Sequence, residues 1–480
     1  MEEEFQGLLD GYGKLSRFTM SNGELCFASR IMDTGFYNYS VSRGSVAPSM
    51  LFQETTPARN FSGLRNMNGA NDNVFVNTYT LGDPADPNYF RCTTDSQKLV
   101  EFNPDTLAMH VETSWNDHID TGIAMGSAHP LPEVLLSTAP SQQCVINVHP
   151  QVGYLGNSHD VSVFRVCADS PYTRVVLASV SDLAYMPYFH SWGLTENRAV
   201  LPLMKFTLDM NAVIGGKTIS EAFLSEDDAN PDTSILVVPL SEAAAATCTL
   251  PNQHLFFTHT VNTYESKAAD GTVTVVMDVV AFDQNPFVKA ALYMYRDKTT
   301  RDTMFGGKTG ARGVPTRVTM TLSPSGVCVG TVGGVMPGFG SDEAMGESST
   351  DFTKINPKYH GKKYCVFYAD QWHSVPSGSY ATMAVVKYNV CTGESVYWRG
   401  PSDNFYPSEP SFVPTEGGTA EDDGVLIFSV LNGETRTSNF LVVDARSMQT
   451  VHNATLPDTI GFTTHGQFYS GLLATAPVAV

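Results

Sequence analysis

Short runs of β-branched and aromatic residues recur along the whole chain of 480 residues, and glycine, proline, asparagine or aspartate closes each run. Such lengths and compositions predict β-strands. Asp270-Gly271 and Asn432-Gly433 supply the turn residues that hairpins prefer. Many short strands with few helical segments predict an all-β fold, either a sandwich, a barrel or a propeller. The clearest runs are TRVVLASV (173–180), SILVVPL (234–240), TVTVVMDVVAF (272–282), ATMAVVKYNV (381–390), GVLIFSVL (424–431) and FLVVDAR (440–446).

No proline- or serine-rich linker and no shift in composition divides the chain, so we interpret residues 1–480 as a single domain. Residues 241–246 are the best short candidate for a helix. Residues 336–355 are rich in glycine, serine and acidic residues, which predicts a long surface loop. The sequence shows no repeat of the kind that marks common propeller blades, so the pattern alone does not choose among the three all-β folds.

The net charge is −20, because 49 acidic residues outnumber 29 Lys and Arg. A phosphate backbone requires a basic surface, so this charge argues against a nucleic-acid partner. No apolar stretch reaches the roughly 20 residues that span a bilayer. The acidic start MEEEFQGLLDGYGKL lacks a basic segment followed by an apolar run, so we expect no secretory signal. These features predict a cytoplasmic protein.

The eight cysteines are scattered singly, without the CxxC pairs of zinc or thioredoxin sites. In a cytosolic protein, we expect all of them to be reduced thiols. Three Asn-x-Ser/Thr sequons, at Asn38, Asn60 and Asn453, are then interpreted as chance matches, because N-glycosylation requires secretion.

Four of the 12 histidines lie in unusual settings, flanked by small or apolar residues, as expected where a side chain points into a lined cavity. Neutral imidazole suits Fe(II) and adds no negative charge to a metal site. Their spacings of 61, 69 and 206 residues prove nothing alone, but they fit separate blades that each contribute one inward residue. The four contexts are GSAHP around His129, PYFHSWGLTEN around His190, FFTHTVNTYE around His259 and FTTHGQFY around His465.

These contexts resemble, in the same order, the four iron-ligand motifs of the carotenoid cleavage oxygenase family. HSWGLTEN (190–197) is similar to the animal branch, which contains the β-carotene oxygenases and the isomerohydrolase of the retinal pigment epithelium. The resemblance covers nearly the whole chain. It extends to LLDGYGKLSRF (8–18), NDNVFVNTYTLGD (71–83), YPSEPSFVP (406–414) and AEDDGVLIFSV (420–430).

The resemblance implies a seven-bladed β-propeller, with loops and short helices capping the active site. One Fe(II) would lie on the central axis, bound by His129, His190, His259 and His465, which are both the metal ligands and the catalytic residues. Two coordination positions would stay open for O2 and substrate. Because this chain begins almost at the DG motif, we expect it to lack the N-terminal strand segment usual in the family.

The resemblance also implies that carboxylates orient three of the histidines. The matching positions are Asp95, Asp351 and Glu409. The family usually has Glu at all three, so two of the side chains are one methylene shorter here. A carboxylate that accepts the second ring N–H of a histidine fixes its tautomer and raises its basicity as a ligand.

The function that the resemblance implies is oxidative cleavage of a conjugated C=C bond in a carotenoid or apocarotenoid, giving two carbonyl products. Alternatives within the family are retinyl-ester isomerohydrolysis and cleavage of stilbene-like phenols. A propeller that binds a polyene without catalysis is an alternative from another class. No Ser-His-Asp elbow, P-loop or dinucleotide fingerprint competes, since Gly333 to Gly338 is followed by Phe339-Gly340 where a P-loop needs lysine.

The expected partners are O2 and a lipophilic polyene, and we expect a monomer. Four aromatic residues near the histidine motifs are candidates to line the substrate path, with core packing as the alternative. The apolar stretch 201–216 is either a peripheral membrane contact or a buried strand. The candidate lining residues are Tyr188, Phe189, Trp192 and Phe468.

Overall fold

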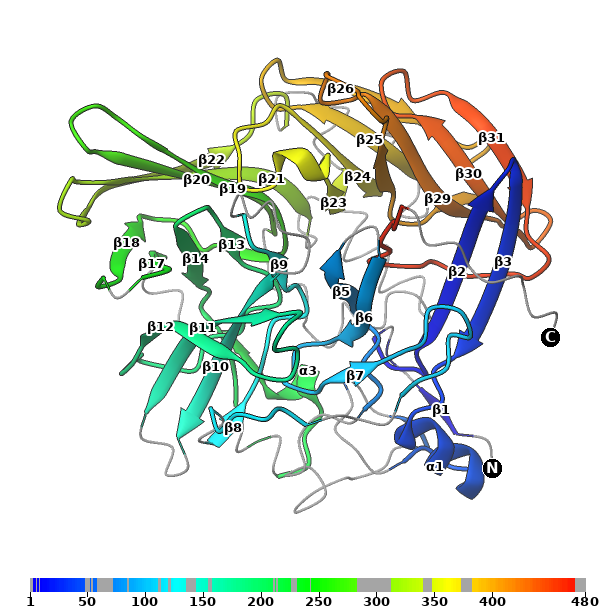
Figure 1. Cartoon of the computed structure of the whole chain (residues 1–480), viewed down its shortest axis with the longest axis horizontal. Helices are drawn as coiled ribbons and strands as arrows, with labels where there is room; N and C mark the ends of the chain where they lie inside the picture. The colour runs from blue at the N-terminus through cyan, green and yellow to red at the C-terminus, as the bar shows by residue number, and fades with distance from the viewer. Residues whose placement is uncertain are drawn as a thin grey trace.

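Antiparallel sheets built from consecutive hairpins surround a common centre (Figure 1). This arrangement is a β-propeller with few helices, so the prediction of an all-β propeller is confirmed. The computed structural model describes residues 3–5, 7, 9–47, 52, 55–57, 72–83, 86–110, 114–119, 122–134, 144–153, 158–209, 212, 215–225, 231–241, 243–282, 312–339, 348–372 and 382–470.

Six sheets of three to five described strands form the blades, and they follow one another in chain order. The first blade contains β5 (Asn77–Asp83), β6 (Asp86–Thr93) and β7 (Val100–Glu101). The second contains β8 (Gly122–Ala124), β9 (Leu131–Pro132), β10 (Cys144–Gly153), β11 (His159–Cys167) and β12 (Val175–Val180). The third contains β13 (Gly193–Leu194), β14 (Arg198–Leu203), β17 (Thr233–Pro239) and β18 (Ala246–Leu250).

The remaining three blades come from the second half of the chain. The fourth contains β19 (Phe256–Lys267), β20 (Val273–Phe282), β21 (Gly313–Leu322) and β22 (Cys328–Val335). The fifth contains β23 (Ser349–Lys354), β24 (Val366–Trp372), β25 (Met383–Asn389) and β26 (Glu394–Trp398). The sixth contains β27 (Phe405–Pro407), β28 (Ser411–Pro414), β29 (Gly424–Asn432), β30 (Thr437–Asp444) and β31 (Thr450–Thr455).

Among the described residues, three two-stranded sheets accompany the blades. The longest is a hairpin of β2 (Lys14–Ser21) and β3 (Glu24–Ile31), which Figure 1 shows in dark blue near β30 and β31. The others pair β1 (Glu4–Phe5) with β4 (Thr55–Thr56), and β15 (Phe206–Leu208) with β16 (Phe223–Ser225). The described helices are short: α1 (Gly35–Arg43), α3 (Ile219–Ala222) and the 3-10 helix η3 (Pro357–Tyr359).

Both faces of a blade are buried because its neighbours pack against them. In β20, Val275, Met277 and Val279 join the apolar cluster shared with the third blade. The alternating Val276 and Val280 pack into a different cluster, shared with the fifth blade. Burying one such side chain contributes about 1.5–3 kcal/mol. This two-sided packing explains why the strands read as nearly continuous apolar runs.

Two local predictions are wrong. Residues 241–246 hold no helix among their described positions, because Ala246 starts β18 and pairs with Val237 in an antiparallel hairpin. Residues 336–355 are not one surface loop, because Ser349–Lys354 form β23 with buried polar side chains. The polar composition of β23 misled the prediction, since Ser349 accepts a hydrogen bond from the backbone of Gly313 and Asp351 contacts His259. Residues 340–347 lie outside the described part.

Six of the eight cysteines form disulfides, so the prediction of reduced thiols is wrong. Their partners are 23, 80 and 26 residues apart in sequence, and the fold brings them together. Only Cys26 and Cys92 are free. The three bridges are Cys144–Cys167, Cys248–Cys328 and Cys365–Cys391.

The described part of the stretch 201–216 begins as a buried strand. Leu201 is fully buried in β14, which pairs with both β13 and β17. Residues 210, 211, 213 and 214 lie outside the description. Across the described chain, no helix is long and apolar enough to cross a membrane.

Candidate metal centre

Four different blades bring the four predicted histidines to one point. His129 lies in the loop between β8 and β9, His190 precedes β13, His259 lies within β19 and His465 follows β31. Each offers one ring nitrogen, and these four atoms all lie within 4.8 Å of one another. The Nε2 atoms of His129 and His190 are 3.2 Å apart, as are those of His259 and His465.

The backbone at two of these positions departs from regular structure. The register of β19 against β20 shifts between Phe257 and Thr260, and His259 lies at this irregularity. Such bulges commonly re-aim a side chain. His465 has a φ of 56°, in the left-handed region that residues other than glycine seldom occupy. Both departures present an imidazole to the shared point, and strain of this kind concentrates at functional sites.

Hydrogen bonds tie the histidine segments of successive blades together. The Ser127 hydroxyl donates to the carbonyl of His190 at 2.6 Å, and the Ser191 hydroxyl donates to the carbonyl of Thr258 at 2.7 Å. The Thr93 hydroxyl donates to the carbonyl of Ala128, which precedes His129. Because these donors are buried, the positions of the ligand loops depend on one another.

Three carboxylates contact the second ring nitrogen of three histidines. Nδ1 of His190 lies 3.0 Å from Asp95 Oδ2, and Nδ1 of His259 lies 2.7 Å from Asp351 Oδ1. Nδ1 of His465 lies 3.1 Å from Glu409 Oε2. These are the contacts expected of carboxylates that orient metal-binding imidazoles. The two aspartates reach their histidines although each is one methylene shorter than glutamate.

Each aspartate has a further donor that holds it in place. The Tyr188 hydroxyl donates to Asp95 Oδ2 at 2.6 Å, and the backbone N–H of Ala128 donates to Oδ1. The Thr258 hydroxyl donates to Asp351 Oδ2 at 2.8 Å. Burial raises the pKa of Asp351, but its bonds to His259 and Thr258 outweigh burial and lower that pKa overall. This carboxyl is therefore ionised at neutral pH.

Glu409 has a lysine partner as well as its histidine. Burial alone would raise the pKa of Glu409, but Lys354 Nζ at 3.0 Å and the bonds from His465 lower it well below its ordinary value. The backbone N–H of His465 also donates to Glu409 Oε2. The charge of this buried carboxylate is thus balanced within the site, as a buried ion requires.

Two of the four clustered histidines favour the neutral form of the imidazole. Burial, then the charges of His465, His190 and His259, lower the pKa of His129 well below its ordinary value. Burial lowers the pKa of His465 to about 4, with Glu409 opposing it. In His190 burial also lowers the pKa, but Asp95 outweighs it and raises the pKa overall. Neutral His129 and His465 can each offer a lone pair to a cation at neutral pH.

The donor set fits a divalent metal ion. A metal–imidazole bond of about 2.1 Å places neighbouring ligand nitrogens about 3 Å apart, which is close to the two separations of 3.2 Å. The Nδ1–carboxylate contacts of His190, His259 and His465 leave their Nε2 atoms free for the metal. His129 differs, since its Nδ1 lies 3.4 Å from the side-chain amide of Asn77 and meets no carboxylate among the described residues.

The four candidate lining residues have different surroundings. Tyr188 is buried and bonds to Asp95, while Phe189 and Trp192 are fully buried in the apolar cluster between the second and third blades. Phe468 is 37% exposed. Core packing therefore accounts for the described contacts of Phe189 and Trp192.

Phe352 is an aromatic residue at the site that the sequence analysis missed. Its ring centre lies 5.1 Å from that of His259 and 5.6 Å from that of His465. Trp372 and Phe462 pack against it at 5.7 and 5.4 Å. Its position directly after Asp351 was the one available signal, and the surface-loop prediction for that segment obscured it.

Asp370 is a second residue that the sequence analysis missed. It lies opposite Asp351 in the β23–β24 pair and is fully buried. Neither of its oxygens has a hydrogen-bond partner among the described residues. Burial, followed by the charges of Glu409 and Asp351, raises the pKa of Asp370 well above its ordinary value. This shift favours the protonated form of the Asp370 carboxyl, whereas the lowered pKa values of Asp351 and Glu409 favour their ionised forms.

A family model described as retinal pigment epithelial membrane protein matches residues 2–470. The chain belongs to this family, the carotenoid oxygenases. Mouse β,β-carotene 15,15'-dioxygenase is 24% identical over an alignment of 507 positions, which covers 97% of this chain and 84% of that protein. Torulene dioxygenase of Fusarium fujikuroi is 28% identical over 322 residues, which cover 63% of this chain and 53% of that protein. The predicted family is thus confirmed.

Among solved structures, the chain is similar to a cobalt-substituted apocarotenoid oxygenase of Synechocystis. The TM-score is 0.73 at 18% identity, and the match covers 96% of this chain and 88% of that one. At this identity the likeness concerns the fold. It supports the propeller architecture that this carotenoid oxygenase shares with the Synechocystis protein.

Proposed function

We propose that this protein is an Fe(II)-dependent dioxygenase that cleaves a conjugated C=C bond of a carotenoid or apocarotenoid into two carbonyl products. The observation that carries the proposal is the cluster of His129, His190, His259 and His465, whose donor atoms lie within 4.8 Å of one another. The names of its relatives, which include carotene and torulene dioxygenases, support the same chemistry.

In this proposal the four imidazoles bind the iron through their Nε2 atoms. Bound iron would supply the activation of O2 towards an electron-rich double bond. Asp95, Asp351 and Glu409 accept the Nδ1–H of His190, His259 and His465, which fixes each tautomer. Tyr188 and Thr258 orient the two aspartates and so compensate for their shorter side chains.

The aromatic rings around Phe352 would form part of the wall along which the polyene lies. Phe352 contacts both His259 and His465, and Trp372 and Phe462 extend this surface. Flat apolar rings match a flat conjugated chain and exclude water from the reacting bond. Phe468, next to the His465 motif, remains a predicted contributor to the same wall.

The β2–β3 hairpin would serve as an incomplete seventh blade. The Phe18 ring stacks on Phe440 of the sixth blade, with the ring centres 4.7 Å apart. On its other side, Leu15 packs against the cluster that contains Phe90 of the first blade. A hairpin that contacts both end blades closes the ring. We propose that such a ring makes residues 1–480 one domain, and that this domain acts as a monomer with O2 and a lipophilic polyene as partners.

The test combines an iron assay with product analysis. The purified protein is reconstituted with Fe(II), its iron content is measured, and it is incubated with β-carotene or apocarotenals under O2. We expect one iron per chain and aldehyde products on HPLC. His259→Ala should abolish both, whereas His452→Ala, at an exposed position of β31, should change neither.

Other outcomes distinguish the alternatives. Conversion of an all-trans retinyl ester to cis-retinol without O2 would identify an isomerohydrolase instead. Cleavage of a stilbene-like phenol but not of any polyene would assign that substrate class. A reconstituted protein that retains no iron would contradict the enzyme proposal and leave a polyene-binding propeller.

A further inference from the structure

The three disulfides link strands within a blade or between neighbouring blades. Cys144 and Cys167 are directly opposite each other in the β10–β11 pair. Cys248 of β18 and Cys328 of β22 are 80 residues apart and join the third blade to the fourth. A bridge requires Cα atoms within about 7 Å, and here these distances are 4.1 and 5.4 Å. Both cysteine pairs, in different parts of the fold, therefore satisfy this distance condition.

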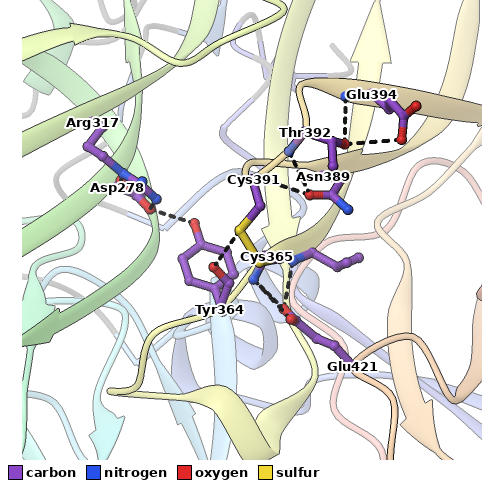
Figure 2. The surroundings of a disulfide bond; sticks show 10 residues. Asp278, Arg317, Tyr364, Cys365, Asn389, Cys391, Thr392, Glu394 and Glu421 are labelled. Atoms are coloured by element: carbon purple, nitrogen blue, oxygen red, sulfur yellow. Dashed lines mark hydrogen bonds and ion pairs between the residues drawn. A yellow bond between two sulfur atoms is a disulfide. The ribbon is translucent and has the colours of Figure 1, made fainter.

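The third bridge, Cys365–Cys391, lies beside residues that hydrogen-bond to neighbouring blades (Figure 2). The backbone N–H of Cys365 donates to Glu421, which belongs to the sixth-blade segment before β29. On the other side, the Tyr364 hydroxyl donates to Asp278, which pairs with Arg317 at 2.7 Å. The backbone that carries Cys365 is thus tied to the blades on both sides of its own.

Three bridges in one chain indicate an oxidising environment. Structural disulfides form and persist in secreted proteins, in the endoplasmic reticulum and in the periplasm, whereas thiols stay reduced in the cytosol. None of the six cysteines contacts a site histidine in the described interactions, so the bridges have no direct role at the metal centre. Their arrangement fits structural bridges.

A second, independent observation concerns the sequon Asn453-Ala454-Thr455. It lies on β31, the outer strand of the sixth blade, and the side chains of Asn453 and Thr455 are both exposed. Residues two apart on a strand share a face. Asn453 Oδ1 accepts a hydrogen bond from Asn439 at 2.7 Å, whereas a glycan would be attached through Nδ2. An exposed outer strand leaves room for an oligosaccharide.

We propose that this chain folds in an oxidising, glycan-adding compartment, where the three disulfides form and Asn453 receives an N-linked oligosaccharide. This inference replaces three expectations: a cytoplasmic protein, the lack of a secretory signal, and a chance sequon. It does not depend on the iron or on the reaction proposed above.

Both modifications have defined chemistry. Each bridge forms when two thiols lose two protons and two electrons, and the electrons reduce a disulfide of the oxidising machinery to a dithiol. For the glycan, the Asn453 amide nitrogen bonds to the anomeric carbon of a lipid-diphosphate-linked oligosaccharide. The sugar–phosphate bond breaks, the lipid diphosphate leaves and the amide releases a proton.

The first test counts free thiols in the full-length protein from the cells that make it. The cells are quenched in acid, and the denatured protein is treated with N-ethylmaleimide without reductant and examined by mass spectrometry. We expect two labelled cysteines, Cys26 and Cys92, and three bridged peptides with the pairing given above. Eight labelled cysteines would overturn the proposed compartment.

The second test concerns the glycan. Peptide N-glycosidase in H2(18O) should convert Asn453 to labelled aspartate. Thr455→Ser keeps the sequon and should keep the glycan, whereas Thr455→Val and Asn453→Gln should lose it, with the corresponding fall in mass. Two free thiols together with an unmodified Asn453 would overturn the glycan assignment.

Discussion

Asp351 holds His259 through one oxygen and accepts from Thr258 through the other. We predict that Asp351→Asn lowers the Fe(II) affinity about 10–100-fold, because the amide removes the charge that raises the basicity of the imidazole. Asp351→Glu keeps the charge and should lose much less. Competition with a chromogenic chelator measures the affinity.

The control for this substitution is Asp403→Asn, at an exposed position away from the cluster, which should leave the affinity unchanged. Equal affinities of Asp351→Asn and the unsubstituted protein would show that Asp351 does not orient a metal ligand.

Asp370 is a buried acid without a described partner, and its pKa is raised. A folded-state pKa above the unfolded value of about 3.9 means that the folded protein binds the proton more tightly. The contribution of Asp370 to the free energy of unfolding is therefore fully present below about pH 4. It is lost as the pH rises towards the folded-state pKa, at about 1.4 kcal/mol per pH unit.

We predict that Asp370→Asn, which cannot ionise, raises the free energy of unfolding at pH 7 and has little effect below pH 4. Urea unfolding at a series of pH values measures the difference. A difference that stayed constant across this range would contradict a raised pKa for Asp370.

The residues of the candidate metal site differ in how far the sequence could predict them. The four histidines and three carboxylates have motif contexts that carry over from the family resemblance, and the structure brings all seven to one place. Phe352 and Asp370 have no such context, because only the pairing of β23 with β24 and the packing around it bring them to the site. Their roles depend on tertiary contacts that a linear pattern does not contain.

At the level of elements, the β2–β3 hairpin contacts the sixth blade through aromatic packing. Phe18 stacks on the buried Phe440. We predict that Phe18→Ala lowers the free energy of unfolding by about 2–3 kcal/mol, somewhat less than a fully buried phenylalanine, because Phe18 is partly exposed.

Met20 of the same strand is 42% exposed, so Met20→Ala should change the stability by less than about 0.5 kcal/mol. Chemical denaturation compares the two variants. Equal stabilities would show that the hairpin does not contribute to closing the ring.

The sequence predicted strands better than their boundaries with loops. Runs such as 272–282 were recognised as strands because alternate side chains are buried against different blades, and this favours apolar residues on both faces. The pattern did not predict β23 because its buried residues are polar, and one of them, Asp351, bonds to His259 and Thr258. The pattern detects burial in apolar surroundings, but it does not detect burial in a hydrogen-bonded network.

For the whole molecule, the bridge between Cys248 and Cys328 closes the longest disulfide loop, with a separation of 80 residues. In the chain-entropy model, a loop of this length stabilises the fold by about 4.5 kcal/mol. We predict that the double substitution Cys248→Ser and Cys328→Ser lowers the free energy of unfolding of the oxidised protein by about that amount.

Cys26→Ser removes a free, partly buried thiol and should cost less than about 1 kcal/mol. Denaturation of both variants without reductant measures the effect. A double variant as stable as the control would mean that this bridge does not constrain the unfolded chain. The sequence could not predict which single cysteines pair at such separations, because the pairing depends on which outer strands become neighbours in the fold.

The last histidine of the cluster lies 206 residues after the third, and each of the four comes from a different blade. During synthesis on the ribosome, a nascent chain therefore carries only three of these side chains until residue 465 has left the exit tunnel. By then every blade has been translated. The candidate metal site is consequently complete only late in biogenesis, and a prematurely terminated polypeptide would reach quality control without all four histidines.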